Sequence, residues 1–195
     1  MAIKRFTESS VTEDIKYNSM LAGNTKTYKI GDIGPGGGKV FYVATTTFTG
    51  GPYSTQCKYL EAALTTGTNP WTDAAYKWSG NVTTLIGTTA DGIGTGYANT
   101  IAMVTQSSTA GRAGTVCRAY RGPNNLDDWY LASRDELNQL YIQRAIIGDM
   151  AVVTQWSSSE ATATTARIRR WDNGIDGTDN KNTSNTTYVR PIRAF

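Results

Sequence analysis

The side chains that could carry chemistry in this sequence are acids, arginines and two cysteines, because the sequence contains no histidine. Without histidine, the usual general base, the most common metal ligand and the Ser-His or Cys-His nucleophile pairs are all missing. Asp127-Asp128 and Asp135-Glu136 are adjacent acids. Asp135 and Glu136 fit the start of a helix, where negative charge is favourable. The sequence therefore predicts a protein that is not an enzyme and that uses no cofactor.

A run of arginines beside an aromatic residue is a candidate binding surface. Guanidinium groups next to an indole can hold an anionic or sugar ligand. The same run is also typical of an exposed, charged strand that discourages pairing along a sheet edge. Two further tryptophans lie in a polar stretch, where they either form a ligand platform or attach a long loop to the core. The candidate ligand-binding residues are Arg169, Arg170, Trp171, Asp172, Trp71 and Trp78.

A calcium site is a separate candidate in the polar segment 172–185. Asp172, Asp176 and Asp179 could form an irregular site, or they could belong to a solvated turn. The spacing of an EF-hand loop is broken, because Gly174 replaces a ligand and Thr183 stands where the bidentate glutamate belongs. We expect the turn and no bound metal.

Length and composition fit one loop-rich domain. The 195 residues are 39% hydrophobic and only 18% charged, with 20 glycines, which is typical of a β or α+β domain. A net charge of +3 without a dense basic stripe excludes the usual nucleic-acid binder. No apolar run suits a signal peptide or a membrane span, so no membrane insertion is expected. Cys57 and Cys117 could pair, but synthesis in the cytosol favours two buried thiols.

Several helices and strands can be expected from the pattern of apolar residues. Tyr97, Ile101 and Val104 predict a helix over 96–106 with one buried stripe, and a second helix is expected over 113–120. Ser133 and Glu136 form a capping box for a third helix that stops at Gly148. Strands are expected at 28–30, 39–46, 58–63, 129–131, 164–171 and 187–193, with a hairpin turn at Asn173-Gly174. Pro191 should place its strand at a sheet edge or in a bulge. The predicted core contains Trp129, Trp156, Leu137, Leu140 and Val189.

Four ordered motifs carry a family resemblance. They are Ile30-Gly-Asp-Ile-Gly-Pro-Gly-Gly-Gly-Lys-Val-Phe-Tyr42, Ile93-Gly-Thr-Gly-Tyr-Ala-Asn-Thr100, the segment 128–141, and Trp156-Ser-Ser-Ser-Glu160 followed by 188–195. Together they resemble the C-type-lectin-like domains of bacterial collagen-like adhesins and phage virion proteins. The resemblance implies an α+β, C-type-lectin-like fold for residues 27–195. That fold has two main helices packed on a twisted antiparallel sheet, long loops, and paired first and last strands.

The segment 1–26 differs from the rest and is expected to be an extended N-terminal docking arm. It has too few apolar residues to form a core alone, yet more than a spacer needs. Its candidate virion-docking residues are Ile3, Phe6, Ile15, Tyr17, Met20 and Leu21.

The resemblance and the arm together suggest a phage virion surface protein. Its domain would serve capsid or tail decoration, host attachment, or both. The alternative is a cellular adhesin or carbohydrate-binding module. Expected partners are other virion subunits, a host-surface glycan or protein, and a second copy of the chain. The expected location is the virion surface, after assembly in the host cytoplasm.

Overall fold

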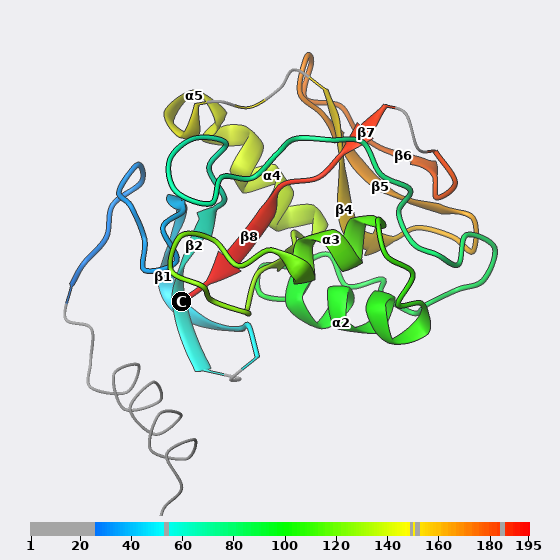
Figure 1. Cartoon of the computed structure of the whole chain (residues 1–195), viewed down its shortest axis with the longest axis horizontal. Coiled ribbons are helices and arrows are strands. Elements are labelled where there is room, and N and C mark those ends of the chain that lie inside the picture. The colour runs from blue at the N-terminus through cyan, green and yellow to red at the C-terminus, as the bar shows by residue number, and fades with distance from the viewer. Residues whose placement is uncertain (1–25, 53–54, 149, 151–152, 184–185) are drawn as a thin grey trace, which may run out of the picture.

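Two four-stranded β-sheets organise the described part of the chain, which comprises residues 26–52, 55–148, 150, 153–183 and 186–195 of a computed structural model (Figure 1). The first sheet has the order β1 (Lys39–Gly50), β2 (Thr55–Ala62), β8 (Pro191–Ala194), β3 (Tyr130–Leu131), and all its pairs are antiparallel. Strand β8 lies inside this sheet, so the prediction of an edge or a bulge at Pro191 is wrong. Pro191 is the first residue of β8, where a missing backbone donor is tolerated.

The second sheet has the order β6 (Asp176–Asn180), β5 (Thr165–Arg170), β4 (Thr154–Glu160), β7 (Thr187–Tyr188). Strands β4 and β7 are parallel, and the other pairs are antiparallel. The turn predicted at Asn173-Gly174 is confirmed. Gly174 has a φ of 74° there, and its N–H donates to the Arg170 carbonyl at 2.9 Å.

Four short helices complete the described residues: α2 (Gly96–Gln106), α3 (Ala113–Ala119), α4 (Arg134–Ile142) and α5 (Arg144–Ile147). The predicted capping box is confirmed, because Ser133 and Glu136 each accept a hydrogen bond from the other's backbone N–H. Gly148 ends α5 with a φ of 67°. Helix α4 packs on β1, β4 and β5, whereas α2 and α3 lie together beside β3 and β4 (Figure 1).

The predicted α+β, C-type-lectin-like architecture is therefore wrong. The described chain is mostly β-sheet, and its helices are 11, 7, 9 and 4 residues long. The segments 154–160 and 165–170 build a sheet of their own with β6 and β7. The last strand pairs with β2 and β3, and Tyr28 packs against Tyr59 and Phe195 without forming a strand. The helices predicted from apolar periodicity are present, but each is only one to three turns long.

The predicted core residues Trp129, Trp156, Leu137, Leu140 and Val189 are all buried, as expected. Cys57 and Cys117 are buried in two different clusters of the core, and no disulfide joins them. Burial raises the pKa of the Cys117 thiol.

A buried ionic network connects the Gly34–Gly38 turn with β8. The Glu61 carboxylate accepts hydrogen bonds from the N–H groups of Gly36 and Gly38 at 2.8 and 2.9 Å. Arg193 donates to Glu61 at 3.0 Å and to Asp128 at 2.6 Å. Burial raises the pKa of Glu61, although Arg193 and the two N–H groups oppose that change. Each group in this network has a partner, which is the condition under which buried charges are tolerated.

Candidate functional site

Helix α2 turns the polar residues Asn99 and Thr100 into the core beside Met103 and leaves Ile101 at the surface. The buried residues of the helix are Gly96, Asn99, Thr100 and Met103. Tyr97 and Val104 are only partly buried, and Ile101 is 36% exposed. The stripe predicted to be buried is thus only partly buried: Tyr97 packs edge-on against the buried Tyr130, whereas Ile101 faces solvent, so the prediction is wrong for Ile101. The surface around Ile101 is a candidate for ligand contact, provided that further apolar residues adjoin it.

Hydrogen bonds to neighbouring backbone explain why α2 is turned this way. The Asn99 side chain donates to the Ala90 carbonyl at 2.7 Å. The Thr100 hydroxyl lies 3.1 Å from the Leu131 carbonyl and accepts a hydrogen bond from the Leu131 N–H, also at 3.1 Å. Buried polar side chains are tolerated when they are hydrogen-bonded in this way. These bonds hold the polar face against β3 and leave the apolar face outside.

A buried carboxylate holds the beginning of α2. Glu136 accepts hydrogen bonds from the Gly94 N–H at 2.9 Å, the Ser133 N–H at 2.7 Å and the Tyr130 hydroxyl at 3.2 Å. A side chain at Gly96 would have its Cβ only 2.2 Å from a Glu136 oxygen, so this close approach requires glycine. Burial raises the pKa of Glu136 from 4.5 to about 6, because its three donors offset only part of the lost hydration.

A buried ion pair holds the loop at the other end of α2. The Glu160 carboxylate accepts hydrogen bonds from the N–H groups of Ile86 and Gly87 at 2.9 Å. It also pairs with the Lys181 ammonium, and both side chains are fully buried. Lys181 lies over the Trp78 ring. This arrangement places Ile86 beside the end of α2.

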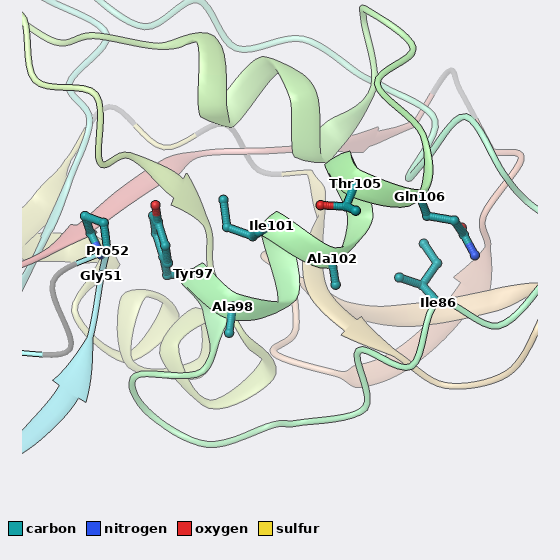
Figure 2. A pocket seen from close by; sticks show the side chains of 9 residues that line it. All are labelled: Gly51, Pro52, Ile86, Tyr97, Ala98, Ile101, Ala102, Thr105 and Gln106. Atoms are coloured by element: carbon teal, nitrogen blue, oxygen red, sulfur yellow. The ribbon is translucent and has the colours of Figure 1, made fainter.

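An open groove of about 630 Å³ lies along the outer face of α2, between the two ends that Glu136 and Glu160 hold (Figure 2). Figure 2 shows Gly51 and Pro52 at one end, near Tyr97, and Ile86 at the other end, near Gln106. Ala98 and Ala102 leave space along the helix between these ends. None of the nine lining residues is charged. They are Gly51, Pro52, Ile86, Tyr97, Ala98, Ile101, Ala102, Thr105 and Gln106.

The three tryptophans predicted to bind a ligand are buried. Trp71 and Trp78 donate their indole N–H groups to the carbonyls of Val189 and Ser157, at 3.1 and 2.7 Å. They therefore attach the long loop 64–92 to the core, which was the other interpretation. Trp171 packs its ring edge-on against Tyr141 and is also buried. A ligand platform made of these rings is excluded because solvent does not reach them.

The polar residues of the same predicted surface differ in how accessible they are to solvent. Arg169 is mostly buried, lies over the Tyr141 ring and donates to the Gly174 carbonyl at 2.7 Å. Arg170 and Asp172 are exposed and lie 3.7 Å apart as an ion pair. Exposed pairs of this kind contribute little to stability. The structure therefore leaves Arg170 and Asp172 accessible, without the aromatic surface that was expected beside them.

The three aspartates of the candidate calcium site point to separate partners. Asp172 pairs with Arg170, and Asp176 accepts a hydrogen bond from the Arg134 guanidinium at 2.7 Å. Asp179 accepts hydrogen bonds from the hydroxyls of Thr183 and Thr187. Within the described ranges, no group of three or more acids or cysteines is arranged to hold a metal ion.

The groove on α2 was missed by sequence reasoning. The available signal was Asn99 and Thr100, whose polar side chains interrupt the face opposite to Tyr97, Ala98 and Ile101. The candidate docking residues Ile3, Phe6, Ile15, Tyr17, Met20 and Leu21 lie outside the described residues. Among the helices that the structure describes, none has the length and apolar character to cross a membrane.

Comparison with known proteins adds a likeness in fold. No protein-family model matches the chain, and no curated protein matches it. Among solved structures, the chain is similar to a fimbrial protein from Bacteroides ovatus, with a TM-score of 0.51 and 16% sequence identity. The match covers 81% of this chain and 44% of the fimbrial protein, so the chain spans less than half the length of that protein. At this identity the likeness concerns the fold alone, and it is a second finding against the predicted architecture.

Proposed function

We propose that this chain is a non-enzymatic, adhesin-like surface protein that binds a neutral ligand in the groove along α2. The observation that carries the proposal is the open groove along α2, whose lining is uncharged and mostly apolar. Open apolar grooves mark binding sites, since leaving such area in water is unfavourable. The fold likeness to a fimbrial protein supports a surface role of this general kind.

The lining of the groove restricts the chemistry of the ligand. With no charged side chain in the lining, an ionic ligand would lose hydration without gaining a partner. Tyr97, Thr105 and Gln106 supply polar atoms beside aliphatic side chains, a combination that suits a partly apolar, uncharged ligand. A segment of a host-surface protein or the apolar face of a neutral glycan has this character.

Display on a phage virion is the form of this function that the sequence motifs favour. In this form the N-terminal arm anchors the domain to other virion subunits, and the groove faces outward. A cellular adhesin is the second candidate, and the fimbrial likeness favours it. Mass spectrometry of purified phage particles and of washed cell surfaces distinguishes the two hypotheses. A virion protein should be found in the particles, and a cellular adhesin should be found on the cells.

The groove itself is tested with a pair of matched variants of the full-length protein. Ala98→Glu places a charge on the open face of α2, and Ala110→Glu places the same charge on the connection between α2 and α3, where the alanine is also exposed. Both proteins are applied to an array of neutral and charged glycans and to bacterial cells. We expect Ala98→Glu to weaken binding at least tenfold and Ala110→Glu to leave it unchanged. Equal binding by both variants, or no binding by the unaltered protein, would contradict the proposal.

A further inference from the structure

A second apolar surface lies apart from the groove, at the α5 side of the molecule. We call it the isoleucine patch, and it consists of Ile30, Ile33, Ile142 and Ile146. Their exposed fractions are between 37% and 52%, and they are four of the seven large hydrophobic residues that are exposed among the described residues. In Figure 1, α5 and α2 lie at opposite sides of the domain, so the patch is separate from the groove.

Contacts between two chain segments bring the turn 30–33 against α5. A Cβ at Gly31 would lie 3.2 Å from the Cγ2 atom of Ile146, which places the turn 30–33 against α5. The Lys39 ammonium donates to the carbonyls of Ile146 and Ile147 at 3.3 and 3.0 Å. Backbone hydrogen bonds of 2.8 Å join Val40 to Gly31 and to Asp32, so the turn is held on the edge of β1.

The rim of the patch is basic. Lys29 and Arg144 lie in segments that carry the isoleucines, and Lys39 reaches α5 from the start of β1. Asp32 is the acid in the turn 30–33. An occupant of the patch should therefore combine apolar side chains with negative charge. The arm contains such a segment at 8–15, where Glu8, Glu13 and Asp14 accompany Val11 and Ile15 without any basic residue.

We infer that residues 8–15 of the arm of a second copy bind over the isoleucine patch. This assignment rests on the anchoring role proposed above for the arm, and it makes a second copy of this chain the subunit that receives the arm. The first described segment runs from the patch toward the margin of the domain, away from α5 (Figure 1). An arm that starts at this margin can reach the patch of a second copy without turning back toward its own domain.

The size of the patch supports an arm as the occupant. Four half-exposed isoleucines provide far less than the roughly 800 Å² per partner of a standard interface. Two patches facing each other would therefore form only a weak contact. An arm that crosses to the partner adds its own apolar side chains and its acids, and two exchanged arms double that contribution.

Cross-linking between full-length proteins tests the assignment. One protein carries Ile15→Cys and the other carries Ile146→Cys. The native thiols Cys57 and Cys117 are buried and do not compete. After mixing under mild oxidation, disulfide-linked heterodimers are measured on non-reducing gels. The matched control replaces Ile146→Cys by Ile175→Cys, because Ile175 is 51% exposed but lies on the β5–β6 turn. We expect at least tenfold more heterodimer with Ile146→Cys, and less of it in high salt because the rim is charged.

Equal yields at positions 146 and 175 would overturn the assignment. It would also be overturned if a single chain carrying both Ile15→Cys and Ile146→Cys closed only on itself. The anchoring role is measured separately, as recovery of a protein lacking residues 1–24 in purified particles. If the truncated protein is lost from the particles but no cross-link is preferred, the arm is an anchor and the patch is not its receptor. If the truncated protein is recovered unchanged, the arm is not an anchor.

Discussion

Thr100→Val should destabilise the protein by removing one hydroxyl from the buried face of α2. Valine has nearly the same shape as threonine, so the change creates little empty space. The Leu131 N–H loses its acceptor in a fully buried position, which costs about 1–3 kcal/mol. We therefore expect the free energy of unfolding to fall by about 2 kcal/mol. For a chain of this size the melting temperature should decrease by about 4–8 °C.

Urea denaturation at neutral pH, followed by circular dichroism, measures this change. Thr105→Val is the control, because Thr105 is exposed on the same helix, and its effect should stay within about 0.5 kcal/mol. Thr100→Ser keeps the hydroxyl and should retain more stability than Thr100→Val. If Thr100→Val were as stable as the unaltered protein, the hydrogen bonds to β3 would not determine the orientation of α2.

Three further predictions concern the buried groups. Burial raises the pKa of Glu136 to about 6 in the folded protein. Between pH 4.5 and 6 the folded protein therefore binds more protons than the unfolded chain. The stability that this group contributes is lost as the pH rises through that range. Relative to Glu136→Gln, the unfolding free energy should fall by about 2 kcal/mol from pH 4.5 to 7 in urea titrations, and a constant difference would contradict this. Trp156→Ala should cost about 3–5 kcal/mol, measured in the same way, since the indole is buried and donates to a carbonyl. Melting temperatures should not change with EDTA or with reductant, since no disulfide joins Cys57 and Cys117, and a large increase with calcium would indicate a bound ion.

Local signals were sufficient to predict α4 and the hairpin turn. The capping residues Ser133 and Glu136 are three positions apart, and Asn173-Gly174 specifies its turn without distant contacts. The same holds for the burial of Trp129 and Trp156, because large apolar side chains in patterned segments rarely stay in water.

Orientation and pairing could not be predicted in this way. The inward face of α2 depends on carbonyls of Ala90 and Leu131, which helical periodicity does not contain. The parallel pair of β4 and β7 brings together segments that are far apart in sequence. The prediction of a ligand surface at Trp171 was wrong for a related reason, because Trp171 packs inward against Tyr141 of α4. The motifs gave no information on these partners, and the architecture inferred from them was therefore wrong.

The position of β8 inside the first sheet has a consequence for biosynthesis. Glu61 and Arg193 are 132 positions apart in sequence, yet they form one buried ionic network. During translation, the edge of β2 and the Glu61 carboxylate therefore lack their partners until residues 191–194 leave the ribosome. Such late, long-range pairing slows folding and exposes strand edges to other chains. The nascent protein should therefore depend on chaperones that bind exposed strands until β8 closes the sheet.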